Sequence, residues 1–293
     1  SNTSGLDIDK MAAATSRPDA VIGLHFFSPA NVMKLLEVVR GKDTSKETIA
    51  SSMKLGKTLN KIAVLSGNAP GFIGNRMLAG YTRQAGEIIL QGATPYQVDK
   101  VLLQFGMPMG PFQMNDLVGL DLGWRARKLG GMKPEDVPIT ARVADKLCEL
   151  ERFGQKTSRG FCIYPEGSRA GQPDPEVVTM VEETSAELGI SRREISDEEV
   201  LKRCLYPLIN EGARLLEQKI AIRPCDIDIV YMNGYGFPEV TGGPMFWADQ
   251  QGLDKILADI RKFGEEYGGE IWEPAPLLVK LVEEGKTFQS LQG

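Results

Sequence analysis

One histidine and one glutamate have the right types and spacing for acid–base chemistry. His25 is the only histidine among 293 residues, and it lies in the apolar run VIGLHFF. Glu37 lies in a second apolar run, MKLLEVV, after a Ser-Pro-Ala-Asn break. Such runs predict strands covered on both faces, where an unpaired carboxylate is costly. If the strands are neighbours, we expect Glu37 to pair with His25, fix its tautomer and make it a general base.

Each of these two residues also has a structural interpretation. A histidine near a strand end can simply satisfy local hydrogen bonds, and a glutamate in a strand can lie on a solvated edge. A polar amide at the start of a helix, as at Asn75 in PGFIGNR, can be a cap or a surface residue. Composition alone does not decide between these interpretations.

Composition does limit the class of protein. The chain is 42% hydrophobic, enough for a sizeable core in two or three units, and its net charge of -5 gives no basic surface for nucleic acid. No apolar run approaches the roughly 20 residues needed to cross a bilayer. The four cysteines have no spacing typical of a metal or redox motif, so we expect buried free thiols and no metal site: Cys148, Cys162, Cys204 and Cys225.

The elements that must position the candidate residues follow from the pattern. Residues 43–60 predict an amphipathic helix with Thr44 or Ser45 as N-cap, and residues 61–65 predict a short strand. After the turn 68–71, a helix is expected from Phe72 onward, with Asn75 in or near its first turn. A second helix is expected over Pro95 to Phe105.

Residues 150–175 lose periodicity and are rich in Gly, Pro, Ser and charge, which predicts a solvated connecting loop. Its Lys156 and Arg159 could instead meet a phosphate. Asp116 and Asp121 could be acids in a cleft, but we expect them to be structural.

The helical part repeats itself. Laying Arg76 on Arg203 places Leu78 on Leu205 and Gln91 on Gln218. After a two-residue insertion, Pro95 falls on Pro224 and Asp99 on Asp228, and later Gly110-Pro111 answers Gly243-Pro244 and Gly119-Leu-Asp121 answers Gly252-Leu-Asp254. Asn75 is answered by Lys202, so the second copy is interpreted as a packing partner.

The run HFFSP followed by MKLLEVV, together with PGFIGNR, resembles the L-3-hydroxyacyl-CoA dehydrogenase family. The resemblance implies an α/β remnant of a Rossmann-type domain followed by two mainly α-helical domains related by the internal repeat. The expected boundaries are 1–68 for the C-terminal part of the NAD-binding domain, 69–165 for the first helical domain and 166–293 for the second.

The resemblance also implies roles for residues. His25 would take the hydroxyl proton of an L-3-hydroxyacyl-CoA while its C3 hydride passes to NAD, and Glu37 would orient His25. Asn75 and Ser4 would bind the substrate through its C3 oxygen or thioester. Asn2 and Ser28 would contact the nicotinamide end of the cofactor, and other members often have Asn where Ser28 stands.

The glycine-rich half of the cofactor site is absent from this sequence. The single close glycine pair with this spacing, Gly234-Tyr-Gly236, does not follow a strand and is expected to be a turn. The sequence is therefore expected to be an N-terminally truncated fragment whose sheet has an exposed edge, a liability for solubility or a site for pairing.

Expectations for the parent protein follow from the same resemblance. It resembles the dehydrogenase portion of multifunctional fatty-acid β-oxidation enzymes, which implies an acyl-CoA substrate and an enoyl-CoA hydratase portion upstream. A monomer is expected because the second copy can cover the apolar face that one-repeat dehydrogenases bury against a second subunit. A cytoplasmic location is expected, with a peroxisomal one as the alternative. A non-catalytic helical assembly module is the competing hypothesis for this chain.

Overall fold

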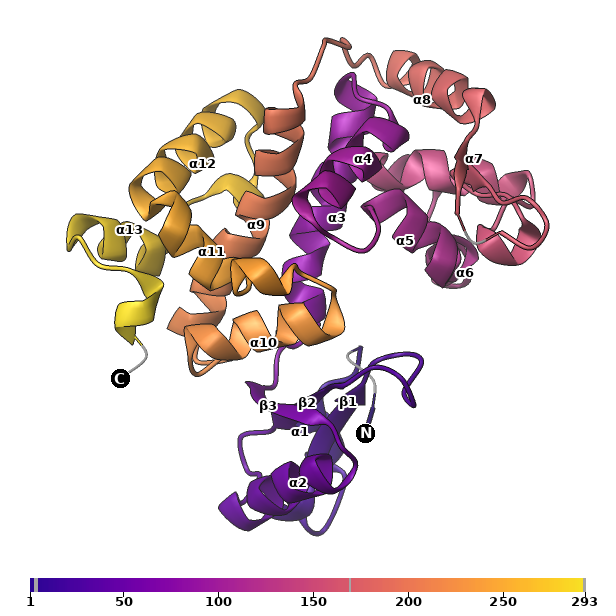
Figure 1. The fold of residues 1–293 in the computed structure, drawn as a ribbon. Coiled ribbons are helices and arrows are strands. Elements are labelled where there is room, and N and C mark those ends of the chain that lie inside the picture. Colours follow the sequence, from indigo (N-terminus) through magenta and orange to yellow (C-terminus); the bar gives the residue numbers. More distant parts are fainter. Residues whose placement is uncertain (3–4, 169, 292–293) are drawn as a thin grey trace. The chain divides into compact units, whose positions relative to one another are not determined.

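The computed structural model describes residues 1–2, 5–168 and 170–291. The chain forms two compact units, one made of residues 1–80 and 205–293 and the other of residues 81–204. Two long helices, α3 (Gly74–Gln91) and α9 (Asp197–Glu217), have residues in both units (Figure 1).

The first unit opens with a three-stranded sheet. Its strands β1 (Ile22–Phe26), β2 (Leu35–Arg40) and β3 (Ile62–Gly67) are ordered β1-β2-β3. β1 and β2 are antiparallel, whereas β2 and β3 are parallel and are connected by α2 (Lys46–Thr58). Ser45 caps α2 by accepting a hydrogen bond from the third residue of the helix, so the second of the two predicted caps is correct.

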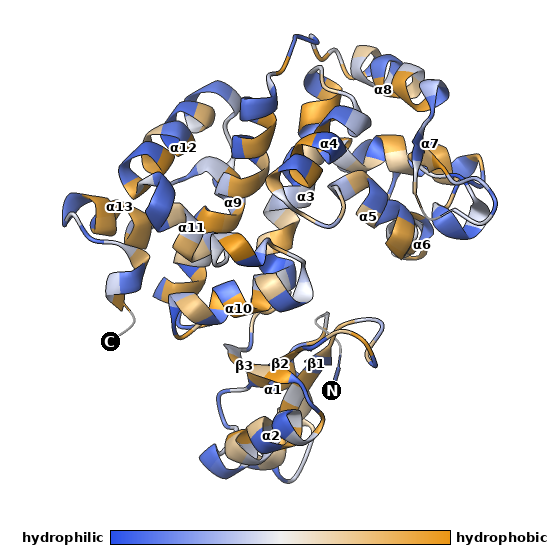
Figure 2. Cartoon of the chain, in the orientation of Figure 1, coloured by the Kyte–Doolittle hydropathy of each residue, from blue (hydrophilic) through white to orange (hydrophobic). Residues whose placement is uncertain are grey.

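The central strand β2 is buried on both faces. Leu35, Leu36, Val38 and Val39 are fully buried, as the continuous apolar run predicts. Figure 2 shows this sheet coloured largely as hydrophobic. α1 (Ile8–Ala13) contributes Ile8 to a cluster with Val39 and Phe72. A carboxylate on this strand is therefore held in an apolar setting.

Helices make up the rest of both units. The first unit continues with α10 (Pro224–Gly234), α11 (Pro244–Gln251), α12 (Leu253–Tyr267) and α13 (Pro276–Glu283). The second unit contains α4 (Pro95–Phe105), α5 (Pro111–Val118), α6 (Asp121–Leu129), α7 (Arg142–Glu149) and α8 (Pro175–Glu187), with a short hairpin of β4 (Cys162–Ile163) and β5 (Gln172–Pro173). None of the helices in the described part of the chain is both long and apolar enough to span a membrane.

In both helical copies, a buried aspartate on the second helix caps the start of the third helix. Asp99 on α4 accepts hydrogen bonds from the backbone N–H groups of Phe112 (2.9 Å) and Gln113 (3.0 Å) at the start of α5. Asp228 on α10 accepts from the two equivalent N–H groups of α11, at 2.7 and 3.3 Å. Burial raises the pKa of each aspartate to about 7. The aspartates aligned in the sequence repeat thus make equivalent contacts.

Contacts between α3 and α9 follow the same equivalence. Arg76 Nε donates to Glu211 Oε1 at 2.5 Å, and Arg203 Nε donates to Gln84 Oε1 at 3.0 Å. The repeat lays Arg76 on Arg203, and the same offset lays Gln84 on Glu211. Gln84 and Glu211 are therefore equivalent positions. The arginine of each copy contacts the residue at this position in the other copy.

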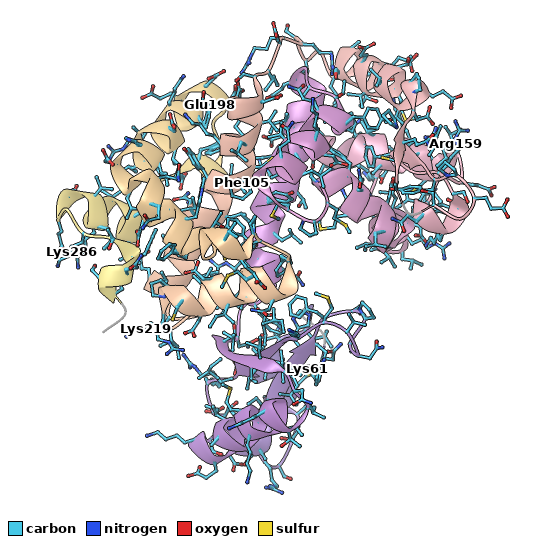
Figure 3. All side chains as sticks on the ribbon, viewed as in Figure 1. Lys61, Phe105, Arg159, Glu198, Lys219 and Lys286 are labelled. Atoms are coloured by element: carbon cyan, nitrogen blue, oxygen red, sulfur yellow. The ribbon has the colours of Figure 1, made fainter. Side chains whose placement is uncertain are left out.

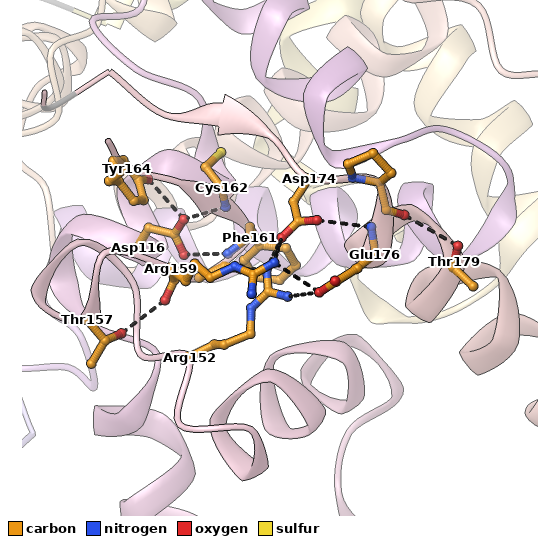
Figure 4. A network of polar contacts seen from close by, with 12 residues as sticks. Asp116, Arg152, Thr157, Arg159, Phe161, Cys162, Tyr164, Asp174, Glu176 and Thr179 are labelled. Carbon is orange, nitrogen blue, oxygen red and sulfur yellow. Dashed lines mark hydrogen bonds and ion pairs between the residues drawn. The ribbon is translucent and has the colours of Figure 1, made fainter. Parts of the chain in front are cut away.

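Residues 150–175 connect α7 to α8, as predicted, but only part of this loop is solvated. Residues 165–168, 170, 172 and 173 are exposed, whereas residues 160–162 are buried. Arg152 is 5% exposed and donates to Asp174 Oδ2 at 2.8 Å and to Gly160 O at 2.7 Å (Figure 4). Arg159 pairs with Asp174 and Glu176, both at 3.0 Å. The prediction of a solvated segment is wrong for its buried part, because polar contacts there leave no periodic signal in the sequence.

The aspartates near this segment are structural, as expected. Asp116 accepts hydrogen bonds from the backbone of Phe161 and Cys162 and from the Tyr164 hydroxyl, each at 2.9 Å (Figure 4). Asp121 pairs with Lys156. The two cations that could have met a phosphate, Lys156 and Arg159, are thus paired with carboxylates.

Candidate active site

The histidine and the glutamate face each other across two strands. His25 on β1 is directly opposite Glu37 on β2 in the antiparallel register. His25 Nδ1 lies 2.6 Å from Glu37 Oε2, and the side chains are 11% and 0% exposed. Because a carboxylate can only accept, Nδ1 carries the proton and Nε2 is the nitrogen that can receive another. The expected contact is present.

The buried carboxylate is held from a second side by the start of a helix. Glu37 Oε1 accepts hydrogen bonds from the backbone N–H groups of Ile73 (3.1 Å) and Gly74 (3.0 Å), where α3 begins. These N–H groups have no partner within the helix, and the helix dipole favours negative charge there. Glu37 is therefore held from two sides in an apolar setting and keeps the imidazole in one orientation.

Asn75 follows directly in the first turn of α3, where the sequence places it. The Tyr235 hydroxyl donates to Asn75 Oδ1 at 2.7 Å. The His25 ring contacts Phe72 (centroids 5.6 Å apart) and Phe27 (4.6 Å), so aromatic rings limit its motion. One short segment, 72–75, thus supplies a ring beside the imidazole, the donors to Glu37 and the amide of Asn75.

The loop between β1 and β2 is fastened at its end. Lys61 Nζ donates to the carbonyl oxygens of Ala30 (2.5 Å) and Met33 (2.7 Å), and Figure 3 marks Lys61 in this part of the molecule. Ser28, in the same loop, has an exposed side chain. This anchoring fixes the segment that follows His25.

The remaining predicted site residues have different outcomes. Asn2 lies beside β1, where its Oδ1 accepts a hydrogen bond from Phe26 N at 2.8 Å, one residue from His25. Ser4 lies outside the described residues. A pocket of about 300 Å³ is lined by residues before and in α1, including Gly5 and Leu6, and by Asn68 and Pro70 in the turn that leads to α3.

Two tyrosines near the site were missed by the sequence analysis. Tyr231 on α10 donates to Gly74 O at 3.1 Å, and Tyr235 at the end of α10 contacts Asn75. The signal available was the pair of glycines around Tyr235, which was interpreted as a turn. Gly236 has φ of +69°, so the turn is confirmed, but the residue that it presents was not recognised.

Comparison with protein families explains this arrangement. The model described as 3-hydroxyacyl-CoA dehydrogenase, C-terminal domain, matches residues 71–164 and again 200–291, and the NAD binding domain of the same enzymes matches residues 1–69. The chain belongs to the 3-hydroxyacyl-CoA dehydrogenase family. The two C-terminal matches confirm the internal repeat, and the fold class is confirmed as a partial α/β NAD-binding domain followed by helical domains.

Curated relatives of this dehydrogenase-family chain are multifunctional enzymes. The peroxisomal bifunctional enzymes of Danio rerio and Homo sapiens are 48% and 46% identical over 97% and 100% of the chain. The peroxisomal fatty acid beta-oxidation multifunctional protein AIM1 of Arabidopsis thaliana is 36% identical over 99% of the chain. The chain spans 41% to 43% of the length of these three relatives.

Two solved structures share the fold over nearly the whole chain. The 3-hydroxybutyryl-CoA dehydrogenase of Escherichia coli matches with a TM-score of 0.75 and 26% identity, covering 97% of this chain and 75% of that one. The dehydrogenase part of multifunctional enzyme 1 from C. elegans matches with a TM-score of 0.70 and 32% identity, covering 95% and 63%. The fold of this family member is thus shared with a 3-hydroxybutyryl-CoA dehydrogenase and with the dehydrogenase part of a multifunctional enzyme.

Proposed function

We propose that this chain is the substrate-side part of an NAD-dependent L-3-hydroxyacyl-CoA dehydrogenase of fatty-acid β-oxidation, which oxidises 3-hydroxyacyl-CoA to 3-ketoacyl-CoA. The observation that carries the proposal is the 2.6 Å contact between His25 and a fully buried Glu37 that α3 holds from the other side. A helical assembly module would have no need to bury a carboxylate and orient it toward an imidazole.

In this proposal each residue has a separate task. His25 Nε2 accepts the proton of the C3 hydroxyl in oxidation and returns it in reduction, while Glu37 keeps the imidazole in the required tautomer. Asn75 donates from its amide to the C3 oxygen or the thioester oxygen, which orients the substrate and stabilises developing charge. Ser4 is proposed to assist Asn75. His25 lies on β1, Glu37 on β2 and Asn75 in the first turn of α3, so regular elements fix the distances between the three side chains.

The chain supplies only part of the cofactor site. When bound, NAD supplies the acceptor for the hydride. Asn2 is held one residue from His25, and Ser28 is exposed after β1, so these two fit contacts to the nicotinamide end. No glycine-rich loop of the G-x-G-x-x-G type occurs in the printed sequence. We therefore assign no residue of this chain to the pyrophosphate or the adenine.

The relatives guide what we propose for the whole protein. Their names describe bifunctional or multifunctional enzymes, which supports an enoyl-CoA hydratase portion upstream in the parent chain. The same names are peroxisomal, which favours the peroxisomal alternative over the cytoplasmic location. We also propose a monomeric parent protein and domains at 1–68, 69–165 and 166–293.

The test is the activity of the full-length protein with a substitution at His25. Reduction of acetoacetyl-CoA by NADH is followed for the natural protein and for His25→Ala, with melting temperature as the folding control. We expect kcat to fall by about 10²–10⁴-fold without loss of folding, because the group that donates the proton to the C3 oxygen in this direction is removed. A folded His25→Ala variant with near-natural turnover would favour the non-catalytic interpretation of this chain.

A further inference from the structure

We infer that Tyr235, from the second helical copy, is a positioning residue of the active site that acts through Asn75. The inference rests on the proposed function, because it takes Asn75 as the residue that binds the substrate oxygen. Its direct support is the hydrogen bond from the Tyr235 hydroxyl to Asn75 Oδ1, at 2.7 Å. The second copy has Lys202 at the position of Asn75, but it would contribute Tyr235, which contacts Asn75, to the site.

The hydrogen bond from Tyr235 favours one orientation of the Asn75 amide, in which Oδ1 accepts from the tyrosine and Nδ2 is the donor. An asparagine side chain can be turned over by rotation about its last bond, which exchanges its acceptor oxygen and donor nitrogen. A phenol that donates to Oδ1 favours one of these two orientations. In the proposed function, Nδ2 is then the end that donates to a carbonyl or hydroxyl oxygen of the substrate. Partial burial and the nearby Glu37 raise the pKa of Tyr235 well above its usual value, so the hydroxyl remains a donor.

The tyrosine is itself held against the start of α3. Its ring stacks on Tyr231 with centroids 4.8 Å apart and planes 22° apart, and Tyr231 donates to Gly74 O. A Cβ at Gly74 would collide with the ring and hydroxyl of Tyr235. The residue before Asn75 thus has to be small for Tyr235 to reach the amide.

The aromatic ring of Tyr235 also connects the second copy to the imidazole. Phe27 packs edge-on against Tyr235 with centroids 5.5 Å apart, and the other side of Phe27 contacts His25 at 4.6 Å. Gly234 lets α10 approach this ring, because a Cβ there would meet Leu35 and Phe27. Tyr235 therefore supports both the proposed base and the proposed substrate amide.

The loop that carries Tyr235 is where the two copies differ. In the first copy, residues 106–110 connect α4 to α5, whereas in the second copy residues 235–243 connect α10 to α11. The longer connection begins with Tyr235, and the equivalent position after α4 is Gly106, which has no side chain. The contact to Asn75 thus comes from a position that both copies have, where the second copy carries a tyrosine and the first a glycine.

The experiment is a double-mutant cycle in the full-length protein. Reduction of acetoacetyl-CoA by NADH is measured for Tyr235→Phe, Asn75→Ala and the combined variant, with Tyr267→Phe as a matched loss of a tyrosine hydroxyl in the same unit. One lost hydrogen bond predicts that Tyr235→Phe lowers kcat by about tenfold. KM should change by less than threefold and Tyr267→Phe should retain natural turnover.

The decisive result is the lack of additivity. If Tyr235 acts through Asn75, adding Tyr235→Phe to Asn75→Ala should change kcat by less than about twofold. A full tenfold further loss would overturn the inference, because a general structural effect adds to the effect of Asn75→Ala. The inference would also be overturned if Tyr235→Phe had natural kcat while Asn75→Ala was impaired. In that case the proposed function would still stand. Natural activity of Asn75→Ala would instead remove the proposed role of Asn75, and with it this inference.

Discussion

In the first helical copy, the first turn of α3 carries Asn75 next to the N–H groups that hold Glu37. In the second copy the equivalent residue on α9 is Lys202, whose Nζ pairs with Glu198 at 2.7 Å. Yet the copies agree in detail elsewhere, since Asp99 and Asp228 cap equivalent helices with equivalent bonds.

The comparison shows that a duplicated scaffold can be retained while the site residues diverge. The capping aspartates and the arginines of α3 and α9 are needed by both copies for packing, so both have them. In the proposed function Asn75 acts beside His25 and Glu37, and the sheet that carries this pair occurs once in the described chain. The second copy contributes instead a longer loop with Tyr235. Seven variants can break or sharpen this comparison.

The largest effect is expected at Glu37, which has no counterpart in the second copy. Glu37→Gln keeps the shape but removes the carboxylate that orients His25 and accepts from the start of α3. We expect kcat for acetoacetyl-CoA reduction to fall by about 10²–10³-fold, because the imidazole loses its tautomer control. A fall of less than threefold in a folded variant would mean that the proton is transferred elsewhere.

A smaller effect, on stability, is expected for the arginines that the copies share. Arg203 is fully buried, so Arg203→Met leaves the buried Gln84 oxygen without its donor and should cost about 3 kcal/mol in free energy of unfolding. Arg76 and Glu211 are partly exposed, so Arg76→Met should cost about 1 kcal/mol. Urea denaturation of both variants gives the values. Equal losses would contradict the difference in burial.

The smallest effect is a change in pH dependence at Asp99 and Asp228. Burial raises the pKa of both to about 7, against about 3.9 in an unfolded chain. The folded state therefore holds these protons more strongly, and the stabilisation that results is complete below pH 4 and lost as pH rises through 7. Asp99→Asn and Asp228→Asn should each flatten this decline in melting temperature. If one variant did so and the other did not, the two caps would not be equivalent.

The contact between His25 and Glu37 could be predicted from sequence because its signals are local. Two apolar runs specify strands, and a titratable residue with apolar neighbours on both sides in each run needs a partner in a buried sheet. The register that places His25 opposite Glu37 then follows from a short connection. Asn75 was predictable for the same reason, since the turn at 68–71 places it at the start of a helix.

Other features could not be read from local pattern. Tyr235 reaches Asn75 over 160 residues of chain, and nothing in the turn Gly234-Tyr-Gly236 indicates what the tyrosine faces. The segment 150–175 looked like a solvated loop because buried ion pairs, such as Arg152 with Asp174, have no periodicity. In both cases tertiary packing determines the role of a residue whose local sequence predicts only a turn or a loop.

The most direct test of the central claim compares the two equivalent positions. Asn75→Ala and Lys202→Ala, made separately in the full-length protein, are assayed for kcat/KM with acetoacetyl-CoA and NADH. If the first copy alone carries the substrate amide, Asn75→Ala should lose about 10- to 100-fold and Lys202→Ala less than twofold. Equal losses, or a larger loss at Lys202, would contradict the assignment of the chemistry to the first copy.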